Sequence, residues 1–216
     1  MFFETLRRIR SIATKHSGKS FTPEGLTHLI RMQFRDPILK FHTHRSPDIP
    51  TNDWWINGTY DIVDDQDDLP CVHINLMFST KKRKLQIDKL DWNQWAFHVA
   101  DVMTHEYLHR YYVHNRGMRF GRGYQTRHMG EYERSMKDYL GCEDEILAYG
   151  FSCAAEMLCY QIPFEQTKTH KLYKKYFFKT DPKVVLKLKR QAIKYIKHLE
   201  RLNNDQIRNS GCRSRI

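Results

Sequence analysis

The stretch VADVMTHEYLHRYYVHN, residues 99–115, determines how this chain is organised. It places His105 and His109 four residues apart, so on a helix both rings project from one face, roughly 5–6 Å apart at Cβ. Apolar residues in and before this stretch would give such a helix a surface to bury: Trp95, Phe97, Val99, Val102, Met103, Leu108 and Val113. We therefore expect a buried helix that carries two ligands for one metal ion.

Glu106 follows the first histidine and completes the pattern H-E-x-x-H, which is typical of zinc-dependent hydrolases. A glutamate at this position can reach a water molecule on the metal without itself binding the metal. A chain of this composition would contain the pattern by chance about 0.03 times. The alternative is an ordinary amphipathic helix with two surface histidines. The pattern predicts Glu106 as a catalytic base beside a zinc ion.

Composition excludes several classes of protein. The chain has 216 residues, of which 40% are hydrophobic and 13% aromatic, so it can build a substantial core and is not disordered. No apolar run approaches the roughly 20 residues that span a bilayer. The N-terminal residues lack the apolar region of a secretory signal. Five scattered cysteines without C-x-x-C indicate reduced thiols. We expect a cytoplasmic protein, in the host cytoplasm if it is phage-encoded, that is not secreted.

The net charge of +11 implies attraction to an anionic partner, which can be nucleic acid, an acidic protein or a membrane surface. Two regions carry much of this charge. Residues 110–127 combine arginines with glycines, and their later part is expected to be a flexible basic loop that is either a lid gripping substrate or simply solvated. The last predicted helix has a basic stripe that is either a nucleic-acid site or a solvated face. Its members are Lys183, Lys187, Arg190, Lys194, Lys197 and Arg201.

The order of the predicted elements indicates a helix-dominated α+β fold with a small mixed sheet before residue 80. Helices are expected at 1–16 and, capped by Thr22, from there to about residue 34. Extended segments follow at 41–48, at 54–63 with a turn at Asn57-Gly58, and at 71–78. Later helices are expected at 131–139, 143–160 and from 181, with fraying from Asn203. We expect one domain, 1–216, with helical appendages at about 1–40 and 181–202.

Two segments before the motif have alternative interpretations. The strand at 71–78 is either a sheet edge that pairs with an extended substrate, as in zinc peptidases, or a plain interior strand. The acidic stretch 61–68 lacks the spacing of a calcium loop, so we expect a solvated hairpin loop there.

A catalytic zinc site needs a third protein ligand. The metzincin extension is excluded because Tyr112 and Asn115 stand where glycine and histidine are required. His114 falls on the opposite side of a continuing helix. Glu145 is the best candidate, because it enters an otherwise apolar helix and a buried carboxylate needs a partner. Glu143 and His128 remain alternatives.

The motifs place the chain near one known class of enzyme. The segments 103–109 and 145–149, the latter reading Glu-Ile-x-Ala-Tyr, resemble gluzincin-type zinc peptidases, including the ImmA/IrrE metallopeptidases and small phage or bacterial relatives. The resemblance covers roughly residues 70–160. It implies a zincin-like metallopeptidase domain with His105, His109 and Glu145 as zinc ligands and Glu106 as general base.

A second resemblance is to SprT-like and Spartan-like proteases, which act on DNA-bound proteins and take a third histidine from the following loop. His128, nineteen residues after His109, would supply that ligand. The sequence departs from that family in having Arg127 and Met129 beside this histidine.

The expected function is that of a zinc-dependent metallopeptidase acting on a protein or peptide. His128, Tyr149 or Tyr124 would stabilise the oxyanion. Two alternatives remain: a basic nucleic-acid-binding protein with a structural zinc site, and a structural component of a phage particle that retains the fold.

Overall fold

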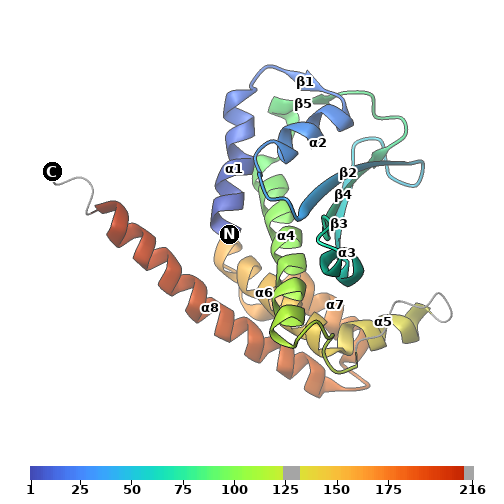
Figure 1. Cartoon of the computed structure of the whole chain (residues 1–216), viewed down its shortest axis with the longest axis vertical. Coiled ribbons are helices and arrows are strands. Elements are labelled where there is room, and N and C mark those ends of the chain that lie inside the picture. The colour runs from blue at the N-terminus through green and yellow to red at the C-terminus, as the bar shows by residue number, and fades with distance from the viewer. Residues whose placement is uncertain (124–131, 212–216) are drawn as a thin grey trace. The chain divides into compact units, whose positions relative to one another are not determined.

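The computed structural model describes residues 1–123 and 132–211, with side chains described for 1–123 and 136–201. The elements form an α+β fold in which helices predominate, as the sequence predicts (Figure 1). The chain divides into two compact units, residues 1–118 and 119–216. Every strand within the described residues belongs to the first unit. The expectation of one domain with helical appendages stays a prediction.

Three strands of the first unit form the small mixed sheet: β2 (Leu39–Ser46), β3 (Trp54–Tyr60) and β4 (Val72–Ser79). Their order is β2-β4-β3, with β4 parallel to β2 and antiparallel to β3. Both sides of β4 are therefore taken up by backbone pairing. The interpretation of 71–78 as a free sheet edge is wrong, and the interior strand is correct. The edge strands are β2 and β3.

The turn expected at Asn57-Gly58 does not form. Strand β3 runs through both residues and stays paired with β4 from Trp54, opposite Phe78, to Tyr60, opposite Val72. An Asn-Gly pair favours a hairpin turn through its tolerance of positive φ, but continuous pairing with β4 holds this segment extended. Gly58 has a different role, which concerns the helix packed on β3.

Alternation along β4 creates the core of the first unit. Val72, Ile74, Leu76 and Phe78 point to one face and are fully buried. Helix α4 (Trp92–Asn115) contacts both β3 and β4. Trp95 anchors it, because its ring stacks on Trp54 with centroids 3.8 Å apart and on Phe78 at 6.0 Å. Trp95, one of the expected apolar residues of the motif helix, thus packs on the sheet.

The remaining elements of the first unit surround α4. Helix α1 (Phe2–Lys15) packs alongside α4 through a buried stripe that includes Ile9 and Ile12 (Figure 1). Helix α2 (Pro23–Arg31) begins as predicted, with the Thr22 hydroxyl accepting a hydrogen bond from the Gly25 N–H, and it ends earlier than residue 34. The smaller elements are β1 (Ser20–Phe21), which pairs with β5 (Leu85–Gln86), and the short helix η1 (Ile87–Lys89).

The acidic stretch is not a solvated hairpin loop. Residues Ile62–Gln66 form a short helix, α3, which begins where the Asp61 carboxylate accepts hydrogen bonds from the Val63 and Asp64 N–H groups. Asp65 is buried, while Asp67 and Asp68 are exposed. The expectation failed because Asp65 finds hydrogen-bond donors from distant parts of the chain.

The second unit is helical: α5 (Tyr132–Gly141), α6 (Glu143–Tyr160), η2 (Phe164–Gln166), α7 (Lys168–Phe177) and α8 (Pro182–Gly211). Its core includes Tyr173, Leu188 and Ala192. Helix α8 approaches α6 closely at Gly150, where an added Cβ would lie 2.6 Å from the Gln191 Cβ. The last helix continues to Gly211, beyond the fraying expected from Asn203.

Two further expectations concern compartment. None of the described helices is long and apolar enough to cross a membrane. Cys71, Cys142, Cys153 and Cys159 are free thiols, as their spacing predicts. Burial raises the pKa of Cys71 and of Cys142 to about 11, so both remain protonated near neutral pH. The cytoplasmic location stays a prediction.

Candidate metal centre

His105 and His109 lie on one face of α4, one helical turn apart. The helix starts at Asp91, whose carboxylate accepts hydrogen bonds from the Asn93 and Gln94 N–H groups, so the register of the motif is set well before the histidines. The two imidazole centroids are 4.8 Å apart and the rings are inclined by 68°. Both residues are buried. The two histidines therefore lie on one buried face of the helix, as predicted.

Glu106 is also buried, and β3 lies directly against it. A Cβ added at Gly58 would lie 2.5 Å from the Glu106 Cγ and 2.7 Å from its Oε1. It would also lie 2.8 Å from a methyl carbon of Val102. These distances are shorter than normal contacts between non-bonded atoms. A side chain larger than that of glycine at position 58 would therefore force Glu106 to shift. Sequence reasoning assigned this glycine to a turn and missed its contact with the predicted base.

Three acidic residues open α6, and they differ in their surroundings. The Asp144 carboxylate accepts a hydrogen bond of 2.7 Å from the Gly121 N–H, and Glu143 accepts one of 3.4 Å from the Arg122 N–H. Both therefore have a role within the second unit, where they hold the chain that precedes the helix. Glu145, the predicted ligand, is only 2% exposed. Glu143, the alternative ligand on this helix, belongs to no metal-binding group found among the described residues.

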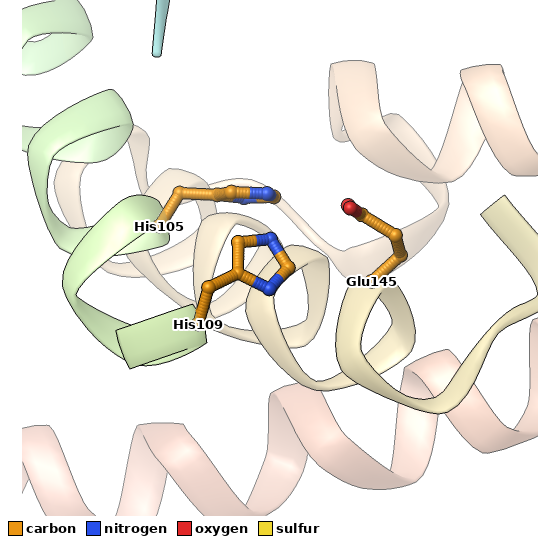
Figure 2. Close-up of side chains that lie close together, drawn as sticks. All are labelled: His105, His109 and Glu145. Atoms are coloured by element: carbon orange, nitrogen blue, oxygen red, sulfur yellow. The ribbon is translucent and has the colours of Figure 1, made fainter. Parts of the chain in front are cut away.

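His105, His109 and Glu145 each offer one ligand atom, and these atoms all lie within 4.8 Å of one another. Figure 2 shows the two imidazoles of α4 and the carboxylate of α6 directed toward one another. All three side chains are buried. This group could hold a metal ion, and it combines the three residues that the sequence singled out as ligands.

A second polar cluster lies farther along α4 within the first unit. The Asp65 carboxylate accepts hydrogen bonds from the Tyr60 hydroxyl at 2.8 Å, from the Arg110 Nε at 3.0 Å and from the His114 Nε2 at 2.6 Å. This arrangement uses His114 as a partner of Asp65, consistent with its exclusion as a ligand. The acidic stretch had given no signal that one of its aspartates would bind α4.

The burial and the hydrogen bonds of Asp65 shift the pKa of its carboxyl group in opposite directions. Burial by itself raises the pKa of the carboxyl, but the hydrogen bonds from Tyr60, His114 and Arg110 outweigh burial, so the pKa lies below its usual value. Burial and the hydrogen bond to Asp65 raise the pKa of Tyr60 well above its ordinary value. At neutral pH the cluster therefore consists of a carboxylate with a protonated tyrosine and a charged arginine.

The candidates for oxyanion stabilisation have different outcomes. His128 and Tyr124 lie outside the described residues. Tyr149 lies one turn beyond Glu145 on α6, and its ring meets that of Tyr173 edge-on at 5.7 Å. Tyr173 is fully buried, and burial together with the negative charge of Glu145 raises the pKa of its hydroxyl far above the usual range. No sequence signal had connected Tyr173 with Glu145, because the two lie on different helices.

Comparison with known proteins gives no relative for this arrangement. No family model matches the chain, and neither a curated protein nor a solved structure does. The function of the chain must therefore be inferred from the side chains of the site and from their chemistry. These side chains are a buried His-His-Glu group and a further buried glutamate, Glu106, which follows the first histidine.

Proposed function

We propose that this chain is a zinc-dependent metallopeptidase in which His105, His109 and Glu145 hold the metal and Glu106 is the general base. One observation carries the proposal. Three buried donor groups have their ligand atoms within 4.8 Å of one another, and Glu106 is buried on the helix that bears both histidines. Ionisable side chains are seldom fully buried unless they are paired or bind a metal.

The donor set supports zinc over other metals. Calcium and magnesium take oxygen ligands almost exclusively, whereas two imidazoles and one carboxylate are characteristic of catalytic zinc sites. Such sites use three protein ligands and leave the fourth position to water or substrate. Structural zinc sites instead have four protein ligands, commonly cysteines. The group at His105, His109 and Glu145 therefore fits a catalytic site better than a structural one.

Zinc held by these residues would supply a Lewis acid and lower the pKa of a water molecule to about 7. Glu106 accepts the proton of the attacking water and passes it to the amine that leaves as the peptide bond breaks. The contact with Gly58 restricts where its carboxylate can lie, because the β3 backbone borders it on one side. A base whose position is restricted in this way loses less entropy on reaching the transition state.

The developing charge on the scissile carbonyl oxygen needs a hydrogen-bond donor as well. We assign this role to Tyr149, because it follows Glu145 by one turn on the same helix. Its phenol would donate to the oxyanion, and the edge-on contact with Tyr173 would restrain its ring.

The test combines zinc content with peptide hydrolysis. Purified protein should contain close to one zinc ion per chain and cleave a peptide library. Glu106→Gln should keep the zinc but lower kcat by about 10²–10⁴-fold, because general-base catalysis contributes that much. Glu143→Gln, which alters a neighbouring acid of α6 outside the group, is the matched control and should leave both measurements unchanged. Absence of bound zinc, or full activity of Glu106→Gln, would overturn the proposal.

A further inference from the structure

The positive charge of the chain is concentrated in the second unit. Residues 1–118 contain 16 Lys and Arg against 14 Asp and Glu, a net charge of +2. Residues 119–216 contain 20 against 11, a net charge of +9. Within residues 168–201, which include α7 and the start of α8, the count is 12 against 2. The high net charge of the chain is therefore due mainly to the second unit, and residues 168–201 carry a large share of it.

Several acidic side chains of the second unit are withdrawn from its surface. Asp144, Glu145 and Glu156 are all buried. Glu156 accepts hydrogen bonds from the Lys168 N–H at 2.6 Å and the Thr169 N–H at 3.1 Å, where it holds the start of α7. These carboxylates act inside the unit, so the exposed surface is more positive than the sequence count suggests.

Helix α8 arranges its cations on one face, which we call the basic stripe. Its members recur every three or four residues and are all exposed: Lys183, Lys187, Arg190, Lys194, Lys197 and Arg201. No acidic residue occurs between 182 and 199. At 1.5 Å per residue the basic stripe is about 27 Å long. Lys189 lies off this face and pairs with Glu165 at 2.6 Å.

The opposite face of α8 is occupied. Val184, Leu188, Ala192 and Leu199 are buried, and the helix packs against α6. An amphipathic helix that binds a membrane must place its apolar face in the lipid. That face of α8 is already covered. Leu186 and Ile193 are exposed beside it, but two separate side chains do not form an apolar face, so insertion would require the unit to open. The basic stripe is thus exposed on the face of α8 opposite to the packed one, and its geometry favours a partner with repeated surface charges over a bilayer.

We propose that the basic stripe of α8 binds the phosphate backbone of nucleic acid without reading base sequence. A duplex carries about one negative charge per 1.7 Å of its length. Cations spaced one turn apart along the protein helix α8 can therefore each lie near a phosphate. The side chains of the stripe are Lys and Arg, which contact phosphates; Tyr195, the aromatic residue in this part of α8, packs against Phe151. Binding of this kind is electrostatic, weak in specificity and strongly dependent on salt.

The experiment measures binding of the full-length protein to a fluorescent duplex of about 20 base pairs between about 50 and about 200 mM salt. The variant Lys187→Ala/Arg190→Ala/Lys194→Ala removes three cations from the stripe. We expect its affinity to fall about tenfold or more near 100 mM salt, and the slope of log K against log salt to become shallower by about 2–3.

A matched control removes the same charge from the first unit. Lys81→Ala/Arg83→Ala/Lys84→Ala alters three exposed cations next to β4 and should change affinity much less. Equal losses in the two variants would mean that net charge alone drives binding and would overturn the proposal. So would salt-independent binding, or tighter binding to vesicles of anionic lipid than to the duplex. Glu106→Gln should bind the duplex as the wild type does, so the result is independent of the peptidase proposal.

Discussion

Two pairs of side chains on α4 share the same i, i+4 spacing: His105 with His109, and Arg110 with His114. Each pair meets one acidic residue from another element. Asp65 contacts the second pair directly, at 3.0 Å from the Arg110 Nε and 2.6 Å from the His114 Nε2. Glu145 belongs to a group in which the ligand atoms of two imidazoles and one carboxylate lie within 4.8 Å of one another.

The difference between the pairs is chemical. Arginine is charged at any ordinary pH, so Arg110 neutralises Asp65 by itself and the cluster is complete without an ion. An imidazole carries a nitrogen lone pair that can bind a metal ion, which an arginine side chain does not offer. Helical spacing thus decides which side chains share a face, whereas the identity of the side chains decides whether that face suits an ion pair or could hold a metal ion.

Replacing each acid by its amide should separate the two pairs, and the larger effect is expected at Glu145. Glu145→Gln should weaken zinc binding more than about 100-fold, since even residues that only support a ligand affect metal affinity by 10–100-fold. Peptide hydrolysis should be lost with the metal. Zinc content by atomic spectroscopy, together with far-ultraviolet circular dichroism to confirm folding, measures this.

Two results would contradict the distinction between Glu145 and Asp65. If Asp65→Asn released zinc as readily as Glu145→Gln, the two clusters would not be functionally distinct. If His128→Ala released zinc and Glu145→Gln did not, the third ligand would be the histidine suggested by the resemblance to SprT-like proteases.

Asp65→Asn should instead reduce stability. It removes the charge that Arg110 and His114 share and weakens the hydrogen bond from Tyr60, so we expect the free energy of unfolding to fall by about 2–3 kcal/mol. The folded variant should keep its zinc. Urea denaturation gives the first quantity, and Asp67→Asn, an exposed neighbour in the same stretch, serves as the control with little expected change. Unchanged stability in Asp65→Asn would show that the second cluster is not structural.

The local parts of this organisation were predictable from the sequence. The motif helix follows from its apolar background, the start of α2 from Thr22 and Pro23, and α6 from an acidic opening followed by apolar residues. Glu145 was selected as a candidate because a carboxylate in such a helix needs a partner. In each case the signal lies within a few neighbouring residues, where helical geometry is set.

The parts that failed depend on residues far apart in the chain. Asp65 is one of five aspartates in an acidic run, and only its contacts with Arg110 and His114 distinguish it. The central position of β4 depends on pairing with β2 and β3, which the pattern of β4 alone does not encode. Gly58 was assigned to a turn because Asn-Gly is a strong turn signal, while its reason is a side chain of α4.

Gly58→Ala acts on Glu106, which follows His105 of the first pair. The added methyl group would meet the Glu106 Cγ at 2.5 Å, so Glu106 must shift. We expect kcat to fall about tenfold, because catalysis is sensitive to small displacements of a positioned group. Zinc content should be unchanged, since the atoms nearest to the added methyl group belong to Glu106 and Val102 and not to His105 or His109.

The matched control for Gly58→Ala is Gly25→Ala. A Cβ there would have the Thr22 Oγ1 as its nearest neighbour at 3.4 Å, so it should be accommodated without effect on kcat. If Gly58→Ala kept full kcat, the position of Glu106 would not matter for the reaction. If it lost zinc, its effect would be structural, and the glycine would not be a positioning residue for the base.

The smallest expected effect is on the pH dependence of stability, to which Asp65 of the second cluster contributes in acid. The pKa of Asp65 is lower in the folded protein than its usual value of 3.8, so the folded state favours the carboxylate. The resulting stabilisation is fully present above about pH 4 and is lost as the pH falls through the folded-state pKa, because both states are then protonated. The amide introduced by Asp65→Asn cannot titrate, so the stability of this variant should decline less steeply below about pH 4 than that of the wild type. Thermal unfolding at a series of pH values measures the two slopes, and parallel curves would show that the pairing of Asp65 with Arg110 and His114 contributes nothing to acid sensitivity.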